Sequence, residues 1–555
     1  MSAPRPSLLT LFLLLGPLAA AQQQPSGRPY YDAQRSLEKQ RDAAKEAKTQ
    51  ARSADAARAA ALLNDPSVWV RDAVFDVLVE RNDAALLKDL ARVLGDRRLS
   101  LASPAVAELY AHCKFAAGRA ALEKAGLRAR DDATVLESIW ALEVLGDKEA
   151  AKALDKVWKK KHPNFRVQGD ALIAMAHLDP QLTRPQAEKA LEHKALPLRI
   201  AALEALRAID ARVAAEAAIG AVSAAPLRAP GGWEARILFA ALDALEGWTA
   251  RAKEKELVVK AIDALIARLD RADGLSRYRC AVTLADLTGE SLGEDPEAWR
   301  GWWAARKDAF TPKDKQPPAP AEPKKKPRSK KKKKGEEEEP APSPEPKRPD
   351  GRVETGGDAK TRVRFHGIPI HSNRLLFAQD VSGGMNNPMD KSKSDSPSKM
   401  AFSAQELKRV LGALSDDVLT NVCFFATEYY LTSERLFPLK KVREKLISFV
   451  GEKAVTPSGK SLGRSNLYDT LAAALEDPEV DTVFFLSEGG PTEGQFLETP
   501  RFMRHLVRLN TYSRTRVTCL QVTASSYGEK FLRRLAEDTG GEFYDLEFIK
   551  KAHGP

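Results

Sequence analysis

The spacing of apolar and polar residues divides this chain into two halves with different periods. From about residue 56 to 308, apolar residues recur every three or four positions, which is the spacing of one face of an α-helix. From residue 362 onward, short apolar runs rich in Val, Phe and Leu alternate with helical patterns. Strands that alternate with helices pair in parallel, so the pattern predicts an all-α region followed by an α/β region.

The helical half contains similar stretches at intervals of roughly 30 to 40 residues, the range of helical repeat proteins. Prolines 66, 163 and 197 lie just ahead of three of these stretches, and proline fits the first turn of a helix. The stretches resemble HEAT or armadillo-like repeats, which implies a solenoid with a long protein-binding face. A non-repeating helical domain is the alternative. The stretches begin at Val70, Pro104, Ala133, Arg166, Arg199, Arg236 and Arg279.

An aromatic cluster ends the helical half. Trp299, Trp302 and Trp303 fall at helical spacing after Asp295-Pro296, a pair that can cap and start a helix. The last repeat of a solenoid must cover the apolar face of its neighbour, so these residues are expected to close the open end. An aromatic ligand-binding site is the alternative.

The α/β half is predicted in more detail by its alternating runs. Residues Tyr429–Phe437 and the strand before them indicate an antiparallel edge, and the remaining strands are expected to be parallel in a doubly wound sheet. The predicted strands are Leu375–Gln379, Asn421–Thr427, Thr482–Leu486, Arg516–Val522 and Glu542–Leu546. The predicted helices are Phe402–Leu414, Leu467–Leu475, Arg501–Leu509 and Glu529–Ala536.

Three loops of this half carry oxygen-bearing side chains next to glycines. They are Asp380-Val-Ser382-Gly-Gly384-Met, Gly463-Arg-Ser465-Asn-Leu, and Phe485-Leu-Ser-Glu488-Gly-Gly. The first follows a buried strand, at the carboxyl end where open α/β sheets bind ligands. Their order and flanking strands resemble a von Willebrand factor A (VWA) domain, which implies an α/β doubly wound, Rossmann-like fold.

The VWA resemblance implies a divalent-cation site, with Mg²⁺ or Mn²⁺ as the expected ion and an acidic partner side chain completing its coordination. Small hard cations take about six oxygen ligands, some of them water. The family's ligand positions carry over to Asp380, Ser382, Ser465 and Glu488, and Gly384 stands where the family has a serine ligand. Glu488 reaches one methylene further than the usual Asp. We therefore expect a degenerate site, which either retains the metal or belongs to an intact, metal-free domain.

The N-terminus has the pattern of a secretory signal. Arg5 provides a positive charge, Leu8–Leu15 forms a short apolar core, and Ala19–Ala21 before Gln22 fits the cleavage rule. A permanent membrane anchor is the alternative, although the apolar core is too short to span a bilayer. The sequence thus predicts an exported protein of the periplasm, the cell envelope or the extracellular space, with no transmembrane span after cleavage.

Charge is concentrated between the two halves. The formal net charge is +11, and Lys330–Lys334 precede Glu336–Glu339 in a segment with almost no apolar residues. Such a segment cannot offset the entropy cost of ordering, so it is expected to be a disordered tether. A lysine block can also bind nucleic acid. The adjoining glutamates and the export signal argue against nucleic acid, and contact with an anionic envelope surface is the favoured alternative.

Cysteine and histidine usage adds no reactive or metal-binding centre. The cysteines lie in apolar patterns without CxxC spacing, so they are expected to be buried small hydrophobes rather than disulfides. His366 and His371 are expected at the surface or in turns. The cysteines are Cys113, Cys280, Cys423 and Cys519.

Together these features predict an exported, non-enzymatic bacterial protein that binds or scaffolds an unidentified protein partner. Metal-dependent adhesion through the VWA-like site is the alternative, and a hydrolase is a further, unfavoured one because no nucleophile and base are clustered. We expect a signal peptide at 1–21, an N-terminal helical segment at 22–55, a HEAT-like repeat domain at 56–308, a disordered linker rich in Lys, Glu and Pro at 309–352, and a VWA-like domain at 353–549.

Overall fold

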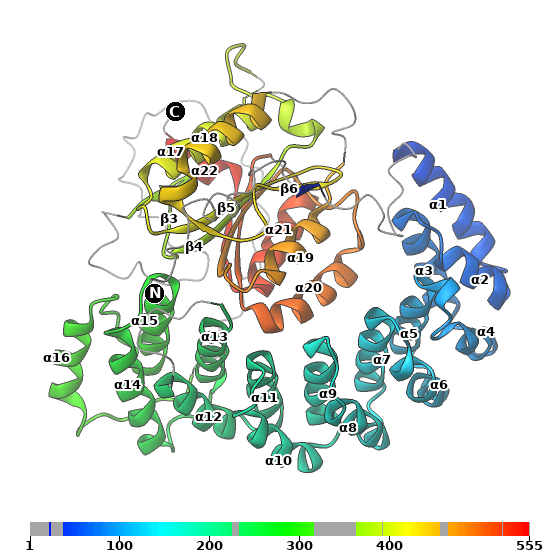
Figure 1. Cartoon of the computed structure of the whole chain (residues 1–555), viewed down its shortest axis with the longest axis horizontal. Coiled ribbons are helices and arrows are strands. Elements are labelled where there is room, and N and C mark those ends of the chain that lie inside the picture. The colour runs from blue at the N-terminus through cyan, green and yellow to red at the C-terminus, as the bar shows by residue number, and fades with distance from the viewer. Residues whose placement is uncertain are drawn as a thin grey trace, which may run out of the picture.

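The protein is a curved arc of helices that partly surrounds an α/β unit (Figure 1). The computed structural model describes residues 22–23, 37–224, 232–315, 362–390, 392–455, 464–523 and 525–553. The predicted signal peptide, residues 316–352 of the predicted linker, and Gly463 lie outside these ranges. Within them, no helix has the length and apolar character needed to cross a membrane.

The arc is a helical repeat-like region, as the sequence predicts. Aspartate or asparagine side chains cap many of its helices; Asp55, Asp131 and Asn164, for example, each accept a hydrogen bond from a backbone N–H of the first turn. The helices are α1 (Leu37–Ala51), α2 (Ala56–Leu63), α3 (Val68–Arg81), α4 (Ala84–Leu90), α5 (Ala102–His112), α6 (Arg119–Lys124), α7 (Asp132–Leu145), α8 (Ala151–Lys159), α9 (Phe165–Leu178), α10 (Pro180–Ala190), α11 (Leu196–Ile209), α12 (Ala211–Ala224), α13 (Gly232–Gly247), α14 (Lys255–Leu269), α15 (Gly274–Thr288) and α16 (Pro296–Arg306).

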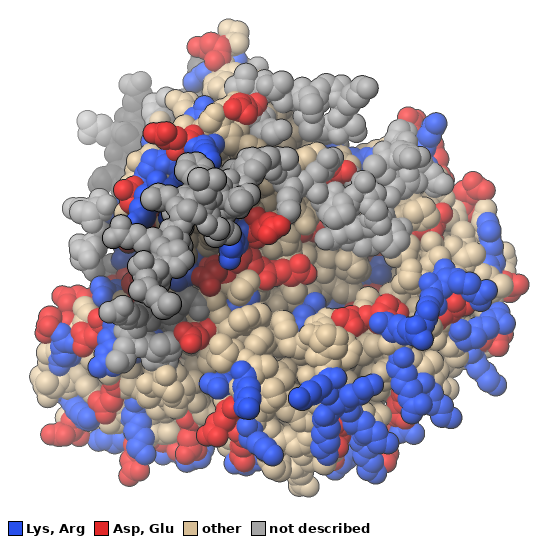
Figure 2. All heavy atoms as spheres, viewed as in Figure 1, with Lys and Arg blue, Asp and Glu red and all other residues tan. Residues whose placement is uncertain are grey.

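The similar stretches of sequence form one side of the arc. Each of the seven predicted stretches falls in one of the helices α3, α5, α7, α9, α11, α13 and α15. These helices lie toward the α/β unit, and we call their exposed side the inner face (Figure 1). On the view of Figure 2, Lys and Arg side chains gather over α6 and α8 on the opposite rim.

The aromatic cluster closes the end of the arc, as predicted. Trp299 and Trp303 of α16 are buried, and the indole N–H of Trp299 donates to the Gly293 carbonyl oxygen at 2.8 Å. Trp302 stacks on Trp303 with ring centroids 5.8 Å apart, and both rings contact Phe310. The indoles therefore cover apolar surface that the arc would otherwise expose to water.

The α/β unit has a mixed sheet in the order β1-β6-β5-β4-β8-β9-β10, with β7 also paired to β5. The neighbouring strands β5, β4, β8, β9 and β10 are all parallel to one another, and β6 and β7 are antiparallel to β5, as the sequence predicts. The strands are β1 (Gln22–Gln23), β4 (Arg374–Asp380), β5 (Leu419–Phe425), β6 (Tyr429–Leu431), β7 (Phe437–Pro438), β8 (Thr482–Ser487), β9 (Arg516–Gln521) and β10 (Phe543–Tyr544), with a separate hairpin β2 (Arg364–Phe365) and β3 (Ile368–Pro369).

Helices cover both faces of the sheet. Successive residues of β4 point to opposite faces, so Leu375 and Phe377 lie in one core and Leu376 and Ala378 in the other. The first core includes α17 (Lys399–Ala413), α18 (Leu439–Val455) and α22 (Leu546–His553). The second includes α19 (Leu467–Glu476), α20 (Thr499–Ser513) and α21 (Ser526–Asp538). Helix α18 was not among the predicted helices.

The cysteines form no disulfide in the described residues. Cys280, Cys423 and Cys519 are buried, as expected, and Cys113 is half-buried. His366 lies in the β2–β3 turn, in agreement with the expectation of a surface or turn position, but its side chain is buried rather than at the surface. Its ring packs between aromatic side chains of the unit, including Phe365 and Phe402.

Candidate functional site

Three of the four predicted metal ligands meet at the carboxyl edge of the sheet. The parallel strands β4 and β8 end side by side at Asp380 and Ser487, and the loop before α19 brings Ser465 to them. One Asp380 oxygen accepts the Ser382 backbone N–H at 2.8 Å. The other accepts the hydroxyls of Ser487 at 2.9 Å and Ser465 at 3.4 Å. We call Asp380, Ser382, Ser465 and Ser487 the edge site.

The edge site is buried and carries one carboxylate. Asp380 is 1% exposed, and burial raises its pKa to about 6, opposed by hydrogen bonds from Ser382 and Ser487 and aided by the charge of Glu488. Hydroxyl and carboxylate oxygens are the donors that Mg²⁺ and Mn²⁺ prefer. Ser487 lies in the third sequence loop but is not among the predicted ligands. Its position at the end of β8, the strand beside β4, could have indicated that it joins the site.

Glu488 lies differently from the other predicted ligands. Its carboxylate rests against Gly384, where a Cβ atom would come within 1.6 Å of Glu488 Oε1. The Lys399 ammonium lies 3.1 Å from Glu488 Oε2 and 3.1 Å from the Thr523 hydroxyl. Sequence reasoning missed Lys399, the first residue of α17, which directly follows a polar insertion at residues 390–398 of the sequence. An ammonium on the Glu488 carboxylate and a filled space at position 384 do not fit the divalent ion that the VWA resemblance implies.

A second functional feature is the contact between the arc and α20. Arginines of α20 and its C-cap form a row, the arginine ladder, which faces one carboxylate from each of six successive inner helices, the acidic row. Representative distances are 2.7 Å for Arg501–Glu108, 2.6 Å for Arg504–Glu137 and 2.8 Å for Arg508–Asp170. The ladder is Arg501, Arg504, Arg508 and Arg514; the acidic row is Asp72, Glu108, Glu137, Asp170, Glu204 and Asp243.

The ladder and the row are buried together, so each depends on the other. Burial by itself raises the pKa of Glu108, but the guanidinium groups of Arg501 and Arg504 outweigh it and hold the pKa well below its usual range. The same guanidinium groups lie over the rings of Phe75 and Trp140, at 4.2 and 3.8 Å from the ring centroids. A buried charge without its partner is costly, so this contact fixes the position of the α/β unit in the arc.

Both ends of the arc also contact the α/β unit. The Trp69 indole of α3 donates to the Thr492 carbonyl oxygen at 3.3 Å, next to the edge site. At the other end, Glu294 pairs with Arg362 at 2.6 Å. The sequence contains a periodic feature that relates to the contact between the arc and α20, because the carboxylates of the acidic row recur with the repeat. That periodicity does not show which segment of the chain the carboxylates bind.

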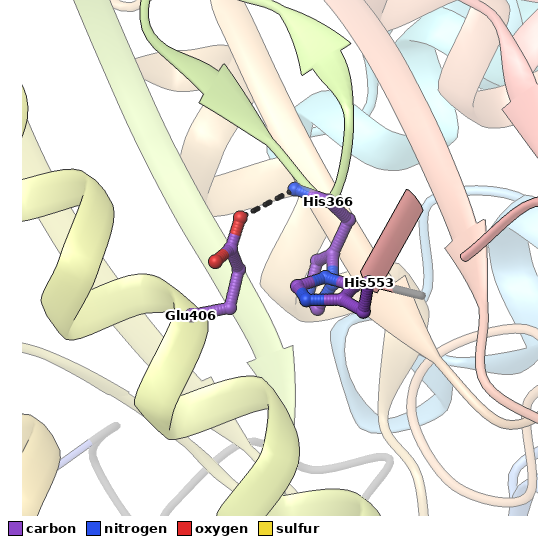
Figure 3. A group of neighbouring side chains, drawn as sticks. All are labelled: His366, Glu406 and His553. Carbon is purple, nitrogen blue, oxygen red and sulfur yellow. Dashed lines mark hydrogen bonds between the residues drawn. The ribbon is translucent and has the colours of Figure 1, made fainter. Parts of the chain in front are cut away.

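Two histidines and a glutamate cluster at the β2–β3 hairpin: His366, Glu406 and His553. Figure 3 shows the Glu406 carboxylate directed to the backbone nitrogen of His366, and the rings of His366 and His553 side by side. The distances are 2.8 Å for that hydrogen bond and 2.9 Å between His366 Nδ1 and His553 Nε2. Both Glu406 oxygens also accept hydrogen bonds from Arg409. The carboxylate is thus engaged by Arg409 and the hairpin, so the cluster anchors the hairpin and the C-terminal helix.

The other clustered titratable groups belong to the docking contact. Glu108, Glu137 and His505 lie close together, but both carboxylates are paired with arginines of the ladder. Burial and the neighbouring Arg504 lower the pKa of His505 well below its usual value. At the edge site, the hydrogen bonds of the described serines that involve a side chain run to Asp380, Gly489 and Thr492, and none runs to a histidine.

Comparison with known proteins gives only partial structural likenesses. No family model and no curated protein matches this chain. The complex of CpcE and CpcF of phycocyanin lyase from Nostoc is 20% identical, with 39% of this chain and 88% of that chain covered and a TM-score of 0.25. The PilB minor pilin from Streptococcus sanguinis is 13% identical, with 32% and 58% covered and a TM-score of 0.25. At such TM-scores neither likeness assigns a function.

Proposed function

We propose that this chain is an exported, non-enzymatic protein-interaction or scaffolding protein, in which HEAT-like repeats hold a VWA-like domain. The VWA assignment is supported by the parallel order β5-β4-β8-β9-β10 and by the meeting of the Asp380, Ser465 and Ser487 loops at one edge. Export is supported by the signal-like N-terminus, and N-terminal sequencing of the mature protein tests it. A mature chain beginning at Gln22 is the expected result.

The main support for a protein-interaction role is that the inner face of the arc already binds a folded protein surface. That surface belongs to the α/β unit of the same chain. Solenoids present long faces that recognise partners by repeated contacts. Here the contact is one carboxylate per repeat against an arginine-bearing helix. This occupied face cannot receive another protein while α20 lies on it.

The surface left for a partner is the carboxyl edge of the sheet. Loops there are exposed, including residues 392–395 of the polar insertion, and surface loops on a rigid scaffold commonly carry binding residues. The docked arc fixes this edge in one orientation, which lowers the entropy cost of binding. The lysine-rich segment at 330–334 would add contact with an anionic envelope surface.

The test uses a photo-cross-linking amino acid at Ser394 in the full chain, expressed in the source cells. We expect a discrete protein adduct, and saturable binding when that protein is purified and titrated against the chain. The same amino acid at Leu182, exposed on α10 of the arc, is the matched control. Adducts of equal pattern at both positions, with no saturable binding, would contradict the proposal.

Metal-dependent adhesion is the second candidate because the edge site gathers a carboxylate and three serines. It predicts that a chelator abolishes binding of the purified partner and that Mg²⁺ or Mn²⁺ restores it. Scaffolding without metal predicts equal affinity with and without the chelator. The two functions are therefore separated by one titration repeated in EDTA.

A further inference from the structure

The two departures at positions 384 and 488 depend on each other. An alanine-like Cβ at Gly384 would lie 1.6 Å from Glu488 Oε1, 2.2 Å from its Cδ and 2.3 Å from its Oε2. These distances are far below any non-bonded contact, so the carboxylate fills the volume of the missing serine side chain. Glycine at 384 and glutamate at 488 are therefore one structural change, rather than two independent losses.

The glutamate is held in that volume by a cation from the chain itself. Lys399 is the first residue of α17, and its backbone N–H donates to the Asn387 carbonyl oxygen at 3.0 Å. Its ammonium reaches Glu488 and the Thr523 hydroxyl, each at 3.1 Å, and its side chain is 8% exposed. A buried ammonium is stable only when it is paired, so Lys399 and Glu488 stabilise each other.

We propose that Lys399 is the resident cation of the edge site and that the Lys399–Glu488 pair makes it independent of divalent metal. This inference rests on the proposed function, since it states how that VWA-like edge operates. A divalent ion near Glu488 would meet the like charge of the Lys399 ammonium, which lies 3.1 Å from Glu488 Oε2, and like charges at such short range repel strongly in a partly buried site. Asp380 would then be the one carboxylate of the edge site available to the ion. A single carboxylate is weak coordination for an ion such as Mg²⁺, which loses its water ligands reluctantly.

The experiment titrates Mg²⁺ and Mn²⁺ into the full chain by calorimetry and follows thermal unfolding in the same solutions. We expect no saturable heat and no shift in Tm for the natural chain up to millimolar metal. Lys399→Met frees Glu488 and should create saturable binding at least tenfold tighter than any in the natural chain. Lys393→Met removes an exposed lysine of the same loop and should change nothing.

A second pair of variants keeps the proposal testable if Lys399→Met does not fold. Gly384→Ser alone should lower the Tm, because the serine side chain would occupy the space that the Glu488 carboxylate fills. Adding Glu488→Asp shortens the acidic side chain, removes this clash and should restore the Tm. Saturable metal binding by the natural chain that is unchanged in Lys399→Met would overturn the proposal. An equal Tm for Gly384→Ser with Glu488 and for Gly384→Ser with Glu488→Asp would also overturn it. None of these measurements needs a partner, so failure to find one would refute the proposed function alone.

Discussion

Replacing Gly169 with alanine should destabilise the full chain, although alanine favours the helix in which this residue lies. Gly169 is in the middle of α9, on the inner face of the arc. A Cβ atom there would lie 2.2 Å from the Tyr512 hydroxyl oxygen and 3.0 Å from two carbons of the same ring. Tyr512 is on α20, and its hydroxyl donates to Asp170 at 2.7 Å. Glycine is thus required at this position only because the α/β unit is docked.

The expected size follows from two opposing effects. Glycine to alanine within a helix stabilises by about 0.5–1 kcal/mol. Forcing a methyl group into a filled contact costs about 1–3 kcal/mol, and disturbing the buried hydrogen bond of Tyr512 adds about 1 kcal/mol. The net effect is a loss of about 1–3.5 kcal/mol. At Gly220 of α12, where a Cβ would meet nothing within 4 Å, the same substitution should instead stabilise by about 0.5–1 kcal/mol.

The assay is urea unfolding of the full chain, followed by circular dichroism, with Gly220→Ala as the matched control. The cycle is completed with Tyr512→Ala, which removes the ring that alanine would strike. In that background Gly169→Ala should change sign and stabilise the chain, giving a coupling energy of about 2–4 kcal/mol. If Gly169→Ala stabilises the natural chain as much as Gly220→Ala does, then α20 does not lie against α9 and the docking is refuted.

Further predictions concern charge and pH. Glu108→Gln removes the buried carboxylate that Arg501 and Arg504 share and leaves each with one carboxylate, Asp72 and Glu137. The uncompensated buried positive charge should lower the free energy of unfolding by about 3–5 kcal/mol in urea, whereas the half-exposed control Glu188→Gln should cost under about 0.5 kcal/mol; equal small effects would contradict the buried ladder. Burial lowers the pKa of His366 to about 3, so between pH 7 and 5 the unfolded chain binds a proton that the folded chain does not. His366 should therefore contribute a fall of about 2 kcal/mol in the free energy of unfolding over that range, and His366→Asn should remove this contribution while that of other buried histidines such as His505 remains; an unchanged pH dependence would show that His366 is not buried.

The sequence by itself determined the elements and their order. Helical spacing, caps and prolines are local signals, so they predicted the inner helices of the arc and the parallel strands within a few residues. The end of a buried strand also placed Asp380 at the carboxyl edge of the sheet, and the VWA resemblance implied that Ser465 lies near it; the structure adds Ser487, because the parallel strands β4 and β8 end on the same side. Helix α18 was missed although Leu439, Val442 and Leu446 follow helical spacing, because the segment is also rich in charge.

Only the tertiary structure decided what the charged residues bind. The repeat gives one carboxylate on each of the six inner helices from α3 to α13. The arginines that pair with Asp72 and Glu108 lie about four hundred residues further along the chain, and periodicity carries no information at that distance. In the same way, the motif shows that Gly384 and Glu488 depart from the family pattern. That the glutamate fills the glycine's empty space and is neutralised by Lys399 depends on side-chain length and on three loops meeting, which only the packed fold determines.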